Sequence, residues 1–162
     1  MYYRDIRKED DAALAALIRG ALKKRGLDIP GTAYYDTQLD HLSSFYLAEP
    51  EKRAYIVLAD DSGKAAGGAG LAECSLFAGC AELQKLYLAK TLQGHGLGYE
   101  LIRLVEDRAR ELGYLRIYLE THTCLQAALH LYEKTGYRSV NRPEAVVHSS
   151  MDRFFIKELF PA

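Results

Sequence analysis

The sequence predicts one α/β (α+β) domain in which about six to seven strands form a sheet flanked by about four helices. Two observations carry this prediction. Amphipathic runs with a period near 3.6 alternate with short runs rich in β-formers, and a chain of 162 residues matches the usual size of a single domain. With 49% apolar residues, no internal repeat and no proline-rich linker, the chain can bury one core. We therefore expect a single domain over residues 1–162.

The first half predicts a strand, two helices and a hairpin. An alternating strand at Tyr2–Ile6 precedes an amphipathic helix that begins at Asp10 or Asp11 as N-cap and stops at Gly26. A second helix follows the link GLDIPGTAYYD. Its apolar residues Leu39, Leu42, Phe45 and Tyr46 share one face, and Asp36 is its expected cap. Strands at Ala54–Ala59 and about Ala65–Leu76 flank DDSG, whose glycine suits a tight antiparallel turn.

The second half predicts two strand–helix units followed by strands. The expected elements, in order, are a strand at Ala81–Ala89, a helix with an apolar stripe from Leu101 to Leu112, a strand at Leu115–Leu119, a helix at Leu125–Thr135, and strands at Tyr137–Val140 and about Ser150–Leu159. A polar loop, NRPEAVVHSS, separates the last two strands. The segment closest to low complexity is the glycine- and alanine-rich run Ala65–Ala72.

Composition argues against several classes of protein. Lys and Arg number 21 against 22 Asp and Glu, and a net charge of -1 gives no general electrostatic attraction to nucleic acid. No stretch approaches the roughly 20 apolar residues of a membrane-spanning helix, and MYYRDIRKEDD lacks the apolar segment of a signal peptide. The three cysteines form no CxxC pair and the histidines no HExxH. We expect a cytoplasmic monomer or homodimer without metal, membrane or nucleic-acid partner.

A glycine-rich turn, Gln93–Gly98, links an apolar strand to an amphipathic helix. Consecutive N–H groups at such a turn, together with the helix dipole, favour phosphate oxygens. The dinucleotide pattern GxGxxG fails because Tyr99 replaces its third glycine, and no GK[ST] follows for a P-loop. The pattern [QR]xxGx[GA] does match, at Gln93, Gly96 and Gly98. A turn that merely packs the helix on the strand is the alternative.

These residues carry a family resemblance. The segment AELQKLYLAKTLQGHGLGYELIRLVEDRARELGY, with the later YLETHTCLQAALHLYEKTGYRSV, resembles the core of the GNAT superfamily of acetyl-CoA-dependent N-acetyltransferases over about Ala81–Val140. It departs from the family at Lys90, where proline is frequent, and at Leu125, where many members carry asparagine. The resemblance implies a mixed, mostly antiparallel sheet with one parallel pair that splays apart. It also implies acetyl-CoA as co-substrate and a small-molecule or peptide amine as acceptor.

The resemblance further implies which main-chain groups hold the cofactor. The pyrophosphate would contact the backbone N–H groups of Gln93, Gly94, His95, Gly96, Leu97 and Gly98. The pantetheine arm would pair, like an added strand, with the main chain of Leu86, Tyr87 and Leu88, and the N–H near Leu88 would face the acetyl oxygen. Lys85, Lys90 and Arg103 could meet the nucleotide phosphates or lie on a solvated face.

Acetyl transfer to an amine requires its neutral form, and an amine with a pKa near 10.4 is deprotonated at pH 7 only at a cost of roughly 4.6 kcal/mol. Glu82 is the candidate general base, because it lies eleven residues before Gln93, the offset at which some family members carry a strand glutamate. The alternative is an ordinary strand-end glutamate on a wet face.

Tyr132, in the LY pair that the family uses for its acid, is the candidate donor to the departing thiolate. The alternative is a tyrosine whose ring only packs in the core. His122 and Cys124 suggest a nucleophile pair, but the resemblance implies direct transfer. The acceptor pocket is expected from Tyr34, Tyr35 and the loop Asn141–Ser149. The chain is thus expected to be an N-acetyltransferase acting on a primary amine, the alternative being a non-catalytic acyl-CoA-binding regulatory module.

Overall fold

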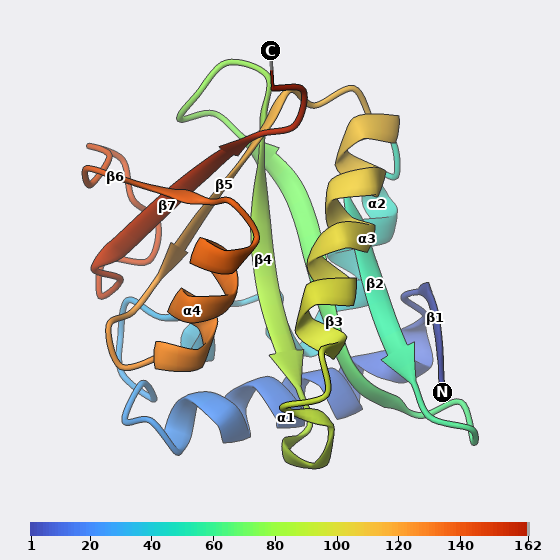
Figure 1. Ribbon diagram of the computed structural model, residues 1–162. Helices are drawn as coiled ribbons and strands as arrows, with labels where there is room; N and C mark the ends of the chain where they lie inside the picture. Colours follow the sequence, from blue (N-terminus) through green and yellow to red (C-terminus); the bar gives the residue numbers. More distant parts are fainter. Residues whose placement is uncertain (162) are drawn as a thin grey trace.

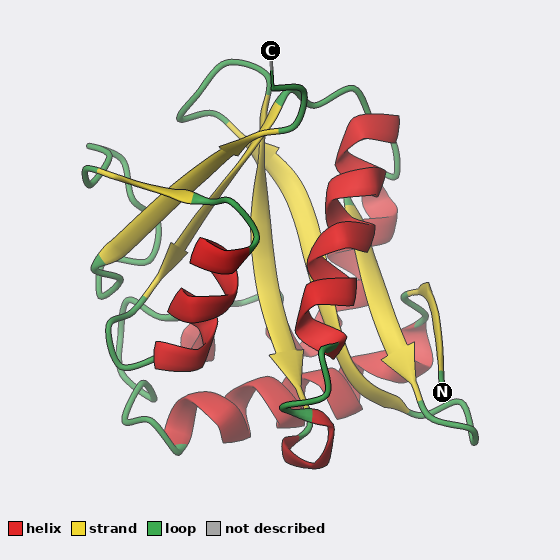
Figure 2. Ribbon diagram, in the orientation of Figure 1, coloured by secondary structure: helices red, strands yellow, loops and turns green. Residues whose placement is uncertain are grey.

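The computed structural model describes residues 1–161 and contains a sheet of seven strands (Figures 1 and 2). The strands are β1 (Tyr2–Asp5), β2 (Ala54–Ala59), β3 (Ala65–Cys74), β4 (Cys80–Leu88), β5 (Arg116–Thr121), β6 (Arg138–Val140) and β7 (Arg153–Glu158). Their order across the sheet is β1-β2-β3-β4-β5-β7-β6, and every neighbouring pair is antiparallel except β4 and β5. The predicted mixed, mostly antiparallel sheet with one parallel pair is confirmed.

Helices cover both faces of this sheet. They are α1 (Asp11–Lys23), α2 (Leu42–Ala48), α3 (Leu97–Glu111) and α4 (Gln126–Lys134). In Figure 1, α3 and α4 lie in front of the sheet, and α1 and α2 lie behind it. Apolar side chains of α3, with Tyr132 of α4, form one buried cluster with the sheet, and those of α1 and α2 form a second with the opposite face. The core is therefore two layers separated by the strands.

The parallel pair β4–β5 separates soon after it begins. Its register covers only Cys80–Glu82 against Arg116–Tyr118, after which the strands diverge toward the lower edge of Figure 1. The β3–β4 register shifts between Gly68 and Gly70, opposite a bulge at Lys85, which has a φ of 51°. The hydroxyl of Tyr55 donates to the Lys85 carbonyl at 2.9 Å and so holds the bulge. The edge of β4 that faces β5 is consequently open beyond Glu82.

Most expected boundaries differ from the observed ones by one to three residues, for example at β3, which ends at Cys74 rather than Leu76. The predicted N-cap role of Asp36 is wrong. The second helix begins with a 3-10 turn, Leu39–His41, and continues as α2 without a side-chain cap. The Asp36 carboxylate instead contacts Lys85 and His148, because ion pairs with partly buried cations are stronger than one bond to an exposed N–H.

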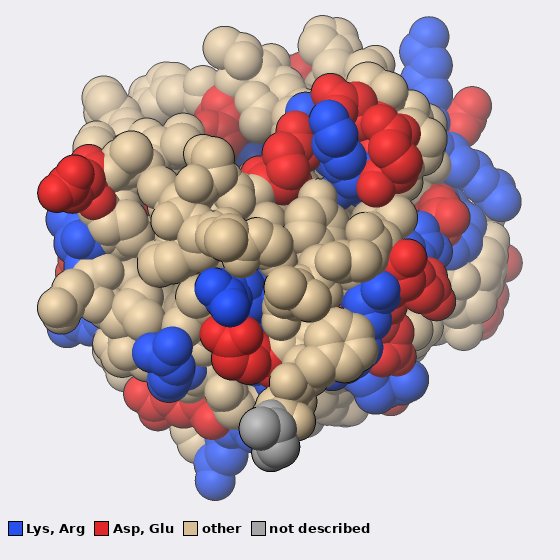
Figure 3. Space-filling model, turned by 90° about the horizontal axis from the view of Figure 1, so that it is seen from above, with Lys and Arg blue, Asp and Glu red and all other residues tan. Residues whose placement is uncertain are grey.

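Charges of both signs adjoin one another on the surface. On the face shown in Figure 3, which looks down on the molecule from the top of Figure 1, Lys and Arg side chains lie next to Asp and Glu side chains. Ion pairs such as Arg53–Glu73 and Arg110–Asp107 join such groups. Among residues 1–161, no helix combines the length and the apolar character needed to cross a membrane.

Candidate active site

A cavity of about 910 Å³ lies where β4 and β5 diverge. Its walls come from β4, the glycine-rich turn, α1 and α4, and its volume is typical of pockets for drug-sized ligands. Of the residues predicted to hold the cofactor or to act in catalysis, all but His95 line this cavity: Glu82, Leu86, Tyr87, Leu88, Gln93, Gly94, Gly96, Leu97, Gly98 and Tyr132. One cavity therefore joins the glycine-rich turn to both candidate catalytic side chains.

The glycine-rich turn presents unused N–H groups to this cavity. Within residues 1–161, the N–H groups from Gly94 to Gly98 have no hydrogen-bond partner, whereas that of Gln93 donates to the Lys90 carbonyl at 3.3 Å. Gly94 and Gly96 have φ values of 80° and 79°, and a Cβ on either would meet no atom within 4 Å. The space around both glycines is therefore open, and unpaired N–H groups at the start of a helix are an arrangement that can accept an anion.

Gly98 has a different role in the same turn. A Cβ at Gly98 would lie 3.0 Å from Cδ2 of Leu131, so the absence of a side chain lets α3 approach α4 closely. The turn thus combines close packing of α3 against α4 at Gly98 with N–H groups that have no partner among the described residues.

The open edge of β4 runs from the glycine-rich turn toward Glu82. The Ala89 N–H donates to Ala66 at 2.8 Å, so the alternation of an antiparallel ladder turns the main chain of Leu88 toward the open side. The Leu88 carbonyl accepts a hydrogen bond from Nε2 of Gln93 at 3.1 Å. Tyr87 is paired with Gly68, and its main chain faces β3. Leu86 and Leu88 are therefore the positions whose main chain an extended ligand could meet.

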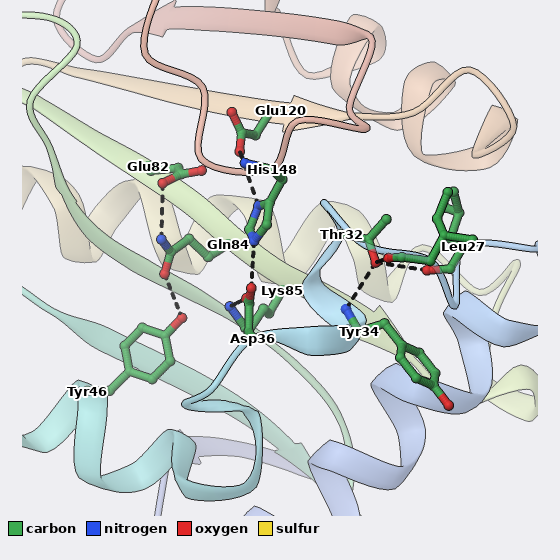
Figure 4. A network of polar contacts seen from close by, with 11 residues as sticks. Leu27, Thr32, Tyr34, Asp36, Tyr46, Glu82, Gln84, Lys85, Glu120 and His148 are labelled. Carbon is green, nitrogen blue, oxygen red and sulfur yellow. Dashed lines mark hydrogen bonds and ion pairs between the residues drawn. The ribbon is translucent and has the colours of Figure 1, made fainter.

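Glu82 is the last residue of a hydrogen-bonded chain that runs from Tyr46 of α2 to β4 (Figure 4). The Tyr46 hydroxyl donates to Oε1 of Gln84 at 2.9 Å, and Nε2 of Gln84 donates to Oε2 of Glu82 at 3.1 Å. Burial, and then the negative charge of Glu120, raise the pKa of Glu82, while the bond from Gln84 opposes the rise. A carboxylate with a raised pKa is better matched to proton transfer near neutral pH than one on a wet face.

A second hydrogen-bonded chain joins distant segments beside the first one (Figure 4). Asp36 contacts Nζ of Lys85 through one oxygen and Nε2 of His148 through the other, both at 2.8 Å. Nδ1 of His148 lies 3.1 Å from Oε1 of Glu120, whose other oxygen accepts a bond from the Tyr118 hydroxyl at 3.1 Å. Burial lowers the pKa of His148, but the bonds to Asp36 and Glu120 outweigh it and raise that pKa to about 9. The ring is therefore an imidazolium at pH 7.

Replacing His148 by Gln is expected to lower the free energy of unfolding by up to about 3 kcal/mol at pH 6. The pKa of His148 is raised from 6.5 to about 9, so its stabilisation is complete below pH 6.5 and is lost as the pH rises through 9. Urea unfolding of both proteins at pH 6, 8 and 10 measures the difference. It should shrink steadily with pH, and an equal difference at pH 6 and pH 10 would contradict the ion pairs.

Tyr132 combines a packed ring with a free hydroxyl. The side chain is 7% exposed, and its ring packs against those of Tyr137 and Phe155. Its hydroxyl has no hydrogen-bond partner in the described part of the chain, and burial raises its pKa. The raised pKa keeps the phenol protonated at pH 7. Because Tyr132 lines the cavity, its hydroxyl is available to donate to a ligand.

A second cavity, of about 340 Å³, adjoins the first and contains one of the two tyrosines predicted to bind the acceptor. Tyr35 lines it, as do Val147 and His148 of the predicted loop Asn141–Ser149. Tyr34 lines neither of these cavities and packs against the core beneath α1, its ring turned away from Asp36 in Figure 4. The two cavities share Glu82, Gln84, Lys85 and His148, which therefore form the wall between them.

Several residues of this wall were not predicted. Glu120, which contacts His148 of this wall, was not predicted either; its side chain is 4% exposed because both faces of this central strand are covered. Lys85 was expected to meet phosphates or to lie on a solvated face, and both expectations are wrong. Its side chain is 3% exposed and forms an ion pair with Asp36. His148 lies 112 residues from Asp36, a pairing that local patterns do not encode.

His122 and Cys124 do contact each other but lie apart from this chemistry. Nδ1 of His122 is 3.1 Å from Sγ of Cys124, in the exposed turn after β5. Neither residue lines either cavity. Arg103 is exposed on α3 and pairs with Asp107, so a contact with nucleotide phosphates stays a prediction.

Comparison with known proteins assigns the chain to a family. The family model described as "Acetyltransferase (GNAT) family" matches residues 22–137, which include β4, the glycine-rich turn and Tyr132. The chain belongs to the GNAT acetyltransferase family. It is 32% identical over 140 residues to the "uncharacterized N-acetyltransferase YjgM" of Escherichia coli K12, covering 85% of this chain and 82% of that protein. This GNAT chain is accordingly an acetyl-CoA-using N-acetyltransferase, whose acceptor the comparisons leave open.

Solved structures show the same fold. An acetyltransferase of the GNAT family from Staphylococcus aureus Mu50 superposes with a TM-score of 0.84 at 18% identity, over 98% of this chain and 99% of that one. The yncA acetyltransferase of Salmonella typhimurium, solved with acetyl-CoA, gives a TM-score of 0.76 at 22% identity, over 100% of this GNAT chain and 95% of its own. The predicted fold class and family resemblance are confirmed.

Proposed function

We propose that this enzyme transfers the acetyl group of acetyl-CoA, its co-substrate, to a primary amine by direct attack, with Glu82 as general base and Tyr132 as general acid. The single observation that carries the proposal is the 910 Å³ cavity, which connects the unpaired N–H groups at Gly94–Gly98 to Glu82 and Tyr132 along the open edge of β4.

The residues present fit coenzyme A. The N–H groups from Gly94 to Gly98 would hold its pyrophosphate, and the main chain of Leu86 and Leu88 would pair with the amides of its pantetheine arm. When bound, acetyl-CoA supplies the acetyl group as a thioester. The chain's own contribution is to hold this thioester beside the wall that separates the two cavities, with the Leu88 N–H available to the acetyl oxygen.

Glu82 would take the amine's proton. It lines both cavities, so its carboxylate can contact an amine in the smaller one beside a thioester in the larger one. Gln84 holds one carboxylate oxygen at 3.1 Å, which fixes its orientation and leaves the other free to accept a proton, directly or through a water molecule.

Tyr132 would stabilise the departing sulfur. Its hydroxyl has no partner among the described residues and its ring is fixed by Tyr137 and Phe155. Full proton transfer from a phenol of reference pKa near 10 to a thiolate of pKa near 8.5 is uphill by about 2 kcal/mol, and the burial that raises the pKa of Tyr132 adds to this cost. A strong hydrogen bond to the sulfur therefore supplies much of the stabilisation.

The test is acetyl-CoA-dependent acetylation of a panel of primary amines. The release of the coenzyme A thiol measures the rate, and mass spectrometry identifies the product. Transfer to at least one amine, saturable in both substrates and without a covalent acetyl-enzyme, is expected. Coenzyme A binding measured by calorimetry without any transfer across the panel would overturn the proposal and favour a non-catalytic acyl-CoA-binding module.

Gly96→Ala is expected to weaken coenzyme A binding at least tenfold, because a side chain at a φ of 79° strains the turn and shifts the N–H groups that it presents. Gly113→Ala is the matched control. Gly113 has a φ of 85°, close to the 79° of Gly96, a Cβ at either meets no atom within 4 Å, and Gly113 lies at the far end of α3. Both variants should lose about 1–2 kcal/mol of stability, but only Gly96→Ala should lose affinity in calorimetry. Equal affinities would remove the pyrophosphate site from this turn.

A further inference from the structure

The smaller cavity offers carboxylates to a ligand but no free cation. Asp36 and Glu82 supply its carboxylates, and Lys85 and His148 are the cationic side chains among its lining residues. Both cations contact Asp36 at 2.8 Å, and the second nitrogen of His148 faces Glu120. The hydrogen bond of Glu82 comes from the neutral amide of Gln84. Asp36 and Glu120 thus share the two cations, and Glu82 has no cationic partner among the described residues.

Lys85 and His148 are also fixed in place. The side chain of Lys85 is almost fully buried, and its main chain is held in the bulge by the Tyr55 hydroxyl. The segment that carries His148 is tied to the link before α2, because the Ser150 N–H donates to the Gly31 carbonyl at 3.0 Å and its hydroxyl to Pro30 at 2.8 Å. A Cβ at Gly31 would collide with the hydroxyl of Ser149 at 2.4 Å and with that of Ser150 at 2.8 Å. Neither cation is therefore free to turn toward a ligand.

Exposed apolar side chains also line this cavity. Tyr35 is 60% exposed and Val147 is 81% exposed, and they come from the two segments that are tied together. Large apolar side chains with this exposure, beside a cavity of about 340 Å³, offer surface to the body of a small ligand.

We propose that the acceptor is a small primary amine with an apolar or aromatic body and no carboxylate beside the amine, and that Asp36 sets this selectivity by occupying both cations. The inference rests on the proposed function, since it describes the acceptor of the same reaction. An ammonium group is attracted to the unmatched Glu82. A neighbouring carboxylate would face Asp36 and Glu82 without a free cation, which weakens binding about tenfold or more at an effective dielectric near 20.

The experiment compares tyramine, tyrosine methyl ester and tyrosine as probes. The three share an amine and an aromatic body, and the ester matches tyrosine in bulk but lacks the negative charge of its carboxylate. Calorimetric titration into the protein saturated with coenzyme A measures affinity without turnover. Tyramine and the ester should bind at least tenfold more tightly than tyrosine. Equal affinity for tyrosine, or no binding by any of the three, would overturn the inference.

Variants test the role of Asp36. Asp36→Asn should release Lys85 and His148 and reduce the preference for tyramine over tyrosine about tenfold. Asp40→Asn is the control, because Asp40 pairs with Arg19 and does not line the cavity. Should Asp36→Asn fold poorly, Gln38→Lys adds a free cation to the cavity lining and should act in the same direction. An unchanged preference in a folded Asp36→Asn would overturn the role of Asp36. Where Gln38→Lys replaces that variant, an unchanged preference would overturn the claim that the lack of a free cation sets the selectivity.

Parallel assays with acetyl-CoA separate this inference from the proposed function. Selective binding of tyramine without acetyl transfer would support the inference about the cavity and contradict the proposed reaction. Acetyl transfer to tyrosine with a KM as low as that for tyramine would leave the reaction intact and overturn the inference.

Discussion

Glu82→Gln is expected to lower kcat/KM at pH 7 by about 100- to 1000-fold. Glutamine keeps the shape of the side chain and a hydrogen bond with Gln84, but it cannot accept the amine's proton. The variant must rely on the small fraction of amine that is already neutral. Deprotonating an alkylamine near pH 7 costs roughly 4.6 kcal/mol. Initial rates with the best acceptor, measured from pH 6 to pH 10, report the loss.

The pH profile distinguishes a base from a merely structural residue. In the wild-type enzyme, activity should rise with pH through the pKa of Glu82, which burial and Glu120 raise above its usual value. In Glu82→Gln the rate should rise about tenfold per pH unit toward the pKa of the free amine, so the two profiles converge near pH 10. A parallel loss at every pH would contradict the assignment.

Glu73→Gln provides the matched control for charge. Glu73 lies on β3 and pairs with Arg53 at the surface, outside both cavities. Its replacement removes the same charge from the neighbouring strand. We expect kcat/KM and its pH profile to stay within about twofold of the wild type, because exposed ion pairs contribute little.

Local patterns predicted the part of the site that local backbone geometry creates. The glycine-rich turn lies between a strand and a helix, as QGHGLG indicates, because glycines with positive φ can form such a turn in the chain's immediate neighbourhood. The positions of Glu82 and Tyr132 followed from family resemblance, and the structure brings both to one cavity. Their catalytic roles stay predictions that the variants test.

The run Ala65–Ala72 shows what local patterns leave out. It has the composition of a low-complexity segment, yet it forms most of β3. A Cβ at Gly68 would lie 2.4 Å from the ring of Tyr55, and one at Gly70 would lie 2.6 Å from the Tyr46 hydroxyl. Small residues therefore make room for the tyrosines that hold the Lys85 bulge and Gln84. This purpose becomes visible only when β2, β3 and α2 are packed together.

The same limit explains why the acceptor side was only partly predicted. The link before α2 and the loop before β7 were expected to form it, but the residue assigned as a helix cap, Asp36, forms its central ion pairs instead. Short-range rules favour a cap because they consider only neighbours in sequence. Folding brings two cations to the same carboxylate, and their combined attraction prevails over one exposed N–H.

Tyr132→Phe is expected to lower kcat about 100-fold while the dissociation constant of coenzyme A changes less than about twofold. Phenylalanine keeps the ring against Tyr137 and Phe155, so the core and the cavity wall are preserved. Only the hydroxyl, which has no other partner among residues 1–161, is removed from the sulfur. Single-turnover rates and calorimetry with coenzyme A measure the two quantities separately.

Tyr137→Phe is the control for the loss of a buried hydroxyl. The ring of Tyr137 packs 5.9 Å from that of Tyr132, measured between centroids, but Tyr137 does not line the cavity. A mutation that acted through packing would affect both variants alike, whereas a proton donor at the sulfur predicts loss in Tyr132→Phe alone. If Tyr132→Phe retains the wild-type single-turnover rate, a water molecule or the free thiolate must carry the step, and Tyr132 is then a wall of the cavity only.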